Sequence, residues 1–137
     1  MSVADYILAV DDEPNIRQLI SLVLEREGFA VKTAANGPEC LTLAAQETPA
    51  LVLLDLHMPG MQGGEVLYRL RSRPSTEHVP VVIVSGSTQL THMADPSQVD
   101  GFLEKPFDLE QLVTVIEGLC PQQKTGIDYS QTADGQS

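Results

Sequence analysis

The sequence predicts an α/β protein of the doubly wound type, in which a five-stranded parallel sheet carries helices on both faces. Five short stretches rich in apolar and β-branched residues alternate along the chain with stretches of helical periodicity. Strand–helix–strand connections are almost always right-handed, so this alternation leaves few arrangements other than a covered parallel sheet. The length of 137 residues is that of one ordinary domain.

The first two strand–helix units are expected between residues 6 and 49. Tyr6–Val10 is the first strand, and the apolar residues of 15–27 recur at helical spacing. Pro14 suits the first helical turn, where a missing N–H is not needed. A short second strand at Ala30–Thr33 precedes an Ala- and Leu-rich helix over about 36–48.

The next two strands are expected to be fully buried. Leu51–Leu54 is continuously apolar, as a strand covered on both faces should be, and it ends in Asp55. A third helix follows around 64–71, and three arginines at or just after its end are expected to be solvated: Arg69, Arg71 and Arg73. Val79–Ser85 is the fourth strand.

The last unit contains one weak and one strong helical signal. Residues 86–100 are polar and include Pro96, which predicts a short or irregular helix of about two turns. Gly101–Glu104 is a brief fifth strand. Asp108, with Gln111 three residues later, predicts a capping box at the start of a clear final helix.

Composition excludes several classes of protein. The chain has 19 acidic and 8 basic side chains and a formal charge of -11, which repels polyanions and argues against direct nucleic-acid binding. No apolar run is long enough to span a bilayer, and the first residues do not resemble a signal peptide, so no membrane association is expected. Cys40 and Cys120 read as reduced thiols, which favours the cytoplasm. Residues 1–119 are the expected domain, and 120–137 the expected disordered tail.

Polar residues follow four of the five strands. In a doubly wound sheet the ligand site lies beyond the carboxyl ends of the strands, so these residues should converge at one edge: Asp11, Asp12, Asp55, Ser85 and Lys105. Three neighbouring carboxylates repel one another unless a hard divalent cation lies among them, and Mg²⁺ fits such oxygen ligands best. The hydroxyl and the ammonium could then bind a phosphoryl group on a carboxylate nucleophile.

These five residues, Pro106 and the string DLHMPGMQGG closely resemble a response-regulator receiver domain of bacterial two-component signalling. The resemblance covers about Tyr6 to Leu119 and implies the flavodoxin-like strand order 2-1-3-4-5. It also implies that a sensor histidine kinase or phosphotransfer protein passes a phosphoryl group from a phosphohistidine to Asp55. The chain would then be a phosphorelay signalling domain, and not an enzyme beyond its own phosphorylation and dephosphorylation.

The resemblance also assigns roles to individual residues. Asp11, Asp12, Asp55 and the backbone carbonyl of His57 would hold Mg²⁺. Ser85 and Lys105 would contact the phosphoryl oxygens, Ser85 and Phe102 would act as the switch, and the Lys105–Pro106 bond would be cis. The switched surface would be presented to a downstream protein, by a monomer or weak dimer because the short polar fourth helix offers little apolar area.

Other readings of these residues stay open. The acidic pair before Pro14 could simply cap a helix, and Lys105 could be an ordinary solvated lysine. Phe102 could be core, and the His57 side chain could either edge the site or face solvent. The main alternative function is a receiver-like interaction module that never turns over phosphate. A flavodoxin-type cofactor protein and a haloacid-dehalogenase-like phosphatase fit less well, because the first loop is acidic and a second Asp is missing after Asp55.

Overall fold

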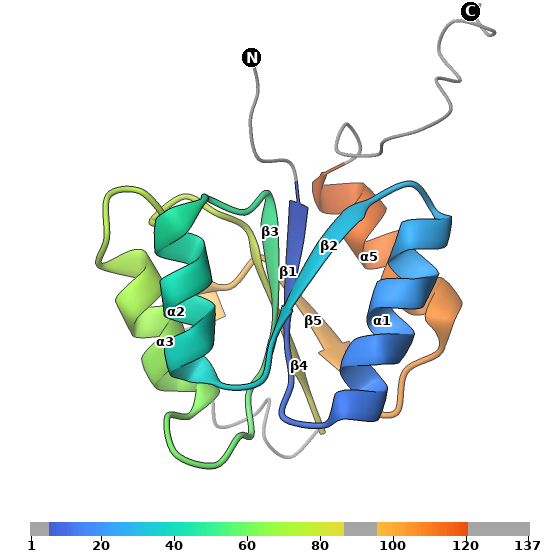
Figure 1. The fold of residues 1–137 in the computed structure, drawn as a ribbon, viewed down its shortest axis with the longest axis horizontal. Helices are drawn as coiled ribbons and strands as arrows, with labels where there is room; N and C mark the ends of the chain where they lie inside the picture. Colours follow the sequence, from blue (N-terminus) through green and yellow to red (C-terminus); the bar gives the residue numbers. More distant parts are fainter. Residues whose placement is uncertain (1–5, 87–95, 121–137) are drawn as a thin grey trace, which may run out of the picture.

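Five parallel strands form one sheet in the order β2-β1-β3-β4-β5 (Figure 1). The structure is a computed structural model that describes residues 6–86 and 96–120. The predicted fold class and strand order are confirmed. The strands are β1 (Tyr6–Val10), β2 (Ala30–Ala34), β3 (Leu51–Asp55), β4 (Val81–Ser85) and β5 (Gly101–Glu104).

Helices cover both faces of the sheet. Helices α2 (Gly37–Gln46) and α3 (Gly63–Arg71) lie on one face, and α1 (Pro14–Arg26) and α5 (Leu109–Leu119) lie on the other (Figure 1). One short 3₁₀ turn, η1 (Pro96–Gln98), precedes β5. No helix in residues 6–86 and 96–120 is long and apolar enough to cross a membrane.

The sheet separates two apolar cores, one under each helical layer. Strands β1, β3 and β4 are buried along their whole length, which explains their continuous apolar sequence. Strand β2 lies at the sheet edge and alternates between more and less exposed residues. A rigid central sheet therefore holds the ends of β1, β3 and β4 in place.

Local signals at the helix ends behave as the sequence predicts. Pro14 begins α1. The Asn36 side chain accepts a hydrogen bond from the Glu39 N–H at the start of α2. Asp108 and Gln111 form the reciprocal capping box of α5, with distances of 2.8 and 3.0 Å. These contacts satisfy N–H groups that the first helical turn leaves free.

Two predictions fall partly or wholly outside the described residues. The short helix expected within 86–100 would occupy 87–95, and the expected tail is 120–137; residues 87–95 and 121–137 lie outside the described part of the chain. Cys120, which the sequence placed at the start of the tail, is instead buried against the core and follows α5 directly.

The expectation of a solvated cluster of arginines at the end of α3 is wrong for Arg71. Its side chain is only 15% exposed and pairs with Asp100 at 3.1 Å. It also donates to the carbonyls of Val79 at 2.8 Å and Gln98 at 2.9 Å. The guanidinium therefore ties the end of α3 to the segment that leads into β5.

The other two arginines differ from each other. Arg69 remains exposed beside Glu65, as expected, whereas Arg73 is half-buried and donates to the Leu41 carbonyl at 3.2 Å.

Candidate functional site

The carboxyl ends of the parallel strands bring the predicted residues together. Asp11 directly follows β1, Asp55 ends β3, Ser85 ends β4 and Lys105 directly follows β5. The register aligns Asp55 with Val84 and thus places it beside Ser85. Because neighbouring strands end at the same edge, residues up to 94 positions apart in sequence come into contact there.

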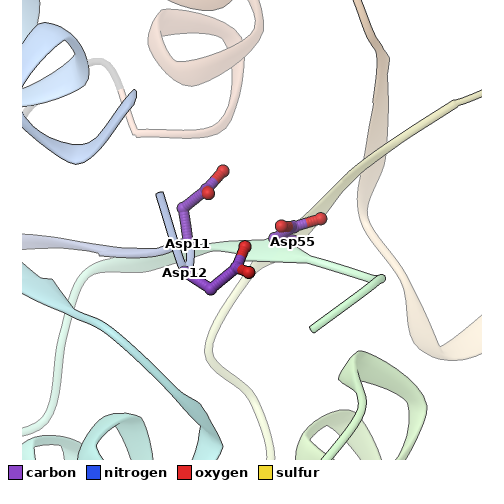
Figure 2. A group of neighbouring side chains, drawn as sticks. All are labelled: Asp11, Asp12 and Asp55. Carbon is purple, nitrogen blue, oxygen red and sulfur yellow. The ribbon is translucent and has the colours of Figure 1, made fainter. Parts of the chain in front are cut away.

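Three carboxylates gather at this edge, as Figure 2 shows for Asp11, Asp12 and Asp55. One oxygen from each residue lies within 4.8 Å of the others. Asp11 and Asp55 are buried, whereas Asp12 is exposed. The helix-cap reading of the acidic pair does not account for this convergence, because in α1 the cap residue is Glu13.

Lys105 reaches into the acidic cluster from the other side. Its Nζ lies 3.4 Å from Asp11 Oδ2 and 3.5 Å from Asp55 Oδ2. The Lys105–Pro106 peptide bond is cis, as predicted. Lys105 is therefore a member of the site and not an ordinary solvated lysine.

Burial and charge act in opposite directions on the ionisable groups here. Burial, reinforced by repulsion from Asp11, raises the pKa of Asp55, although Lys105 and a backbone N–H partly offset this. Burial lowers the pKa of Lys105, but attraction to Asp55 and Asp11 outweighs it, so that pKa is raised. The cluster thus contains an ammonium that stays charged and a carboxylate whose ionisation is costly without a further cation.

The buried Ser85 hydroxyl is a second group at this edge that suits an anionic ligand. Ser85 is buried, and its Oγ has no hydrogen-bond partner among the residues that the structure describes. Leaving a buried hydroxyl unpaired costs about 1–3 kcal/mol. A phosphoryl oxygen bound at this edge would supply an acceptor.

His57 adjoins the acidic cluster, whereas Phe102 lies further back on β5, opposite Ile83 in the sheet. The His57 backbone N–H donates to Asp55 Oδ1 at 3.2 Å, while its side chain is exposed. Phe102 is 42% exposed, so the reading of this residue as plain core is wrong. Its exposed ring is available for the switch role, which stays a prediction.

The donor set fits Mg²⁺. Three carboxylates offer the hard oxygen ligands that this ion prefers, and Mg²⁺ ordinarily keeps several waters and binds phosphate oxygens alongside one or two carboxylates. The adjacent positive charge of Lys105 suits an anionic group next to the ion. The residues can therefore hold a divalent cation together with a phosphoryl group.

Fold and site together define a class of signalling domain in which an aspartate at the end of a central strand is surrounded by acidic, hydroxyl and lysine side chains. The chain belongs to the response-regulator receiver domain family, whose model matches residues 7–117. The two-component identity and the fold that the resemblance implied are thus confirmed.

Individual relatives agree with this family. The chain is 34% identical over 128 residues to the transcriptional regulatory protein SrrA of Staphylococcus aureus, covering 91% of this chain and 52% of SrrA. It spans about half the length of the curated relatives it matches. The structure is similar to chemotaxis protein CheY4 of Vibrio cholerae, with a TM-score of 0.77, 30% identity and coverage of 83% of this chain and 97% of that one.

A third comparison includes bound ligands. The response regulator TrrA of Thermotoga maritima, solved in complex with Mg²⁺ and BeF, has a TM-score of 0.76 and 32% identity, and the match covers 83% of this chain and 97% of TrrA.

Two features of the site were not foreseen from sequence. The Arg17 guanidinium donates to the backbone carbonyl of Asp11 at 2.6 Å, and Gly63 packs against the backbone at Asp55 and Leu56. An arginine in the second turn of a helix and a glycine at the start of one are common, so no sequence signal singles them out.

Proposed function

We propose that this chain is a phosphoacceptor in a two-component phosphorelay and that Asp55 is the residue that becomes phosphorylated. The proposal is carried by one observation: Asp55 lies beside two further carboxylates and the Lys105 ammonium, and the buried Ser85 hydroxyl ends the neighbouring strand. An interaction module without phosphoryl turnover would not require this combination of groups.

The donor would be a phosphohistidine of a sensor histidine kinase or phosphotransfer protein. A carboxylate oxygen of Asp55 attacks phosphorus while the bond from phosphorus to the imidazole nitrogen breaks, and the ring keeps that electron pair and takes up a proton. Lys105 and Ser85 would contact the phosphoryl oxygens. In dephosphorylation a water molecule would attack phosphorus, the bond from phosphorus to the Asp55 oxygen would break, and inorganic phosphate would leave while the carboxylate is restored. The chain would catalyse only these steps, both on itself.

Mg²⁺ would be held by Asp11, Asp12, Asp55 and the backbone carbonyl of His57. When bound, the ion neutralises negative charge on the carboxylates and the phosphoryl group. Removing Lys105 should leave Mg²⁺ binding largely intact but weaken the response to phosphorylation, because its ammonium would contact the phosphoryl group.

Phosphorylation would change the protein's interaction surface through Ser85 and Phe102. The exposed ring of Phe102 lies on β5, which packs beside α5. We propose a monomer or weak dimer that presents this surface to a downstream protein. Light scattering at micromolar concentration, with and without beryllofluoride, tests this; a tight dimer that does not depend on phosphorylation would contradict it.

A cytoplasmic location is supported by the two free, buried cysteines.

Mass spectrometry after treatment with acetyl phosphate and Mg²⁺ tests the central proposal. The wild-type protein should gain one phosphoryl group, whereas Asp55→Asn should gain none. A chelator should abolish labelling of the wild type. Equal labelling of the two proteins would overturn the assignment of Asp55.

A further inference from the structure

We propose that Arg17 is a positioning residue that fixes the peptide between Asp11 and Asp12 and so orients the acidic pair for Mg²⁺ binding. The inference rests on the proposed function, because it concerns the same metal site. It assigns a role to a basic side chain that lies outside the expected set of ligands.

Every polar atom of Asp11 has a partner. Its N–H donates to the carbonyl of Ala34 at 3.1 Å. Its Oδ1 accepts from the Glu13 N–H at 2.9 Å, and its Oδ2 lies 3.4 Å from Lys105 Nζ. Its backbone carbonyl accepts from Arg17 Nη1 at 2.6 Å. Asp11 is therefore held from four directions, and Arg17 supplies the contact to the carbonyl.

The carbonyl contact matters most for Asp12. A peptide unit is planar, so fixing the direction of the Asp11 C=O also fixes the direction in which the chain enters Asp12. Asp12 is exposed, so packing does little to hold it in place, yet its carboxylate is one of the three within 4.8 Å. The orientation of this ligand thus depends on the backbone before it.

Packing of helix α1 against the sheet fixes the position of the Arg17 backbone. Ile20 and Leu24 of this helix are buried in the core beneath the sheet. The guanidinium reaches back from the second turn to the loop before the helix, and a hydrogen bond from a charged donor is stronger than a neutral one. Contacts of this kind, one step removed from a metal, typically change metal affinity by about 10- to 100-fold when lost.

An electrostatic role and a positioning role for Arg17 predict opposite changes in Mg²⁺ affinity when the side chain is removed. A positive side chain beside a cation site repels the cation, so a purely electrostatic role means that removing Arg17 tightens Mg²⁺ binding. A positioning role means that removing it weakens binding. The electrostatic effect also shrinks with added salt, whereas loss of orientation does not.

Calorimetric titration with Mg²⁺ alone, at low and high ionic strength, tests the inference. Arg17→Met keeps the aliphatic stem but removes the charge and the donors, and we expect it to bind Mg²⁺ about tenfold more weakly or worse at both ionic strengths. Arg17→Lys can still donate a hydrogen bond and should lie between Arg17→Met and wild type. Arg26→Met, in the last turn of α1, removes the same charge far from the cluster and should bind like wild type.

The possible results distinguish failure of the positioning role of Arg17 from failure of the proposed phosphoacceptor function. Circular dichroism confirms that each variant is folded, and if Arg17→Met does not fold, the comparison of Arg17→Lys with wild type decides, with weaker binding expected. Equal or tighter binding by the Arg17 variants overturns the positioning role while leaving the proposed function intact. Absence of Mg²⁺ binding by wild type overturns the proposed function and this inference with it.

Discussion

Replacing Gly63 by alanine should destabilise the protein, although the adjacent change Gly64→Ala should not. A Cβ at Gly63 would lie 2.6 Å from the Leu56 Cα and 2.9 Å from the Asp55 carbonyl oxygen, and both neighbours are backbone atoms that cannot rotate away. A Cβ at Gly64 meets nothing within 4 Å. The two glycines begin the same helix, so the pair isolates the effect of this contact.

The expected magnitudes follow from these distances. Overpacking of this kind costs about 1–3 kcal/mol in the free energy of unfolding. At Gly64, alanine lowers the entropy of the unfolded chain and should stabilise by about 0.4–1 kcal/mol. Because the contact involves the Asp55 peptide, Gly63→Ala should also reduce phosphoryl labelling of Asp55, while Gly64→Ala should leave it unchanged.

Urea unfolding followed by circular dichroism is the suitable assay, since the chain contains no tryptophan. The urea midpoint should fall for Gly63→Ala and rise or stay level for Gly64→Ala. Equal shifts of the two midpoints, or a stabilised Gly63→Ala protein, would refute the reasoning from backbone contact.

Three further predictions follow from the same structure. Burial, and to a lesser extent repulsion from Asp11, raises the pKa of Asp55 in the folded protein. The stabilising contribution of the protonated carboxyl is therefore present at low pH and is lost as the pH rises through the folded-state pKa. Without Mg²⁺, Asp55→Asn should raise the urea midpoint at neutral pH, and this gain should vanish in acid. A gain that grows on acidification would show the sign to be wrong. Arg71→Ala should lower the free energy of unfolding by about 2–4 kcal/mol, because it leaves several acceptors unpaired. Arg69→Ala, which removes an exposed ion pair, should lower it by roughly 0.5 kcal/mol or less. Similar costs for the two variants would contradict the interpretation that Arg71 links α3 to the segment before β5. If the exposed His57 side chain orients the hydrolytic water, the dephosphorylation rate of His57→Ala, measured by loss of the phosphoryl label, should differ from wild type across neutral pH; an unchanged rate indicates a solvent-facing histidine.

The sequence by itself determined the order of the elements and the members of the acidic cluster. The continuous apolar run of Leu51–Leu54 and the Asp108 capping box are local patterns, and both appear in the structure where they were expected. Asp55 and Lys105 could be placed at one edge because parallel strands end together. These conclusions need only periodicity, residue type and the handedness of the connections.

Tertiary structure alone decided the contacts that cross between elements. Arg71 looked like a solvated helix end, but the segments before β4 and β5 bring two carbonyls and Asp100 around its guanidinium. Phe102 could have been core or surface until the sheet and α5 placed it. Arg17 and Gly63 contact backbone atoms of the site, and every residue type has the same backbone atoms, so the sequence does not show which residues make such contacts. Such contacts depend on distances between atoms of different elements and loops, which only the folded molecule sets.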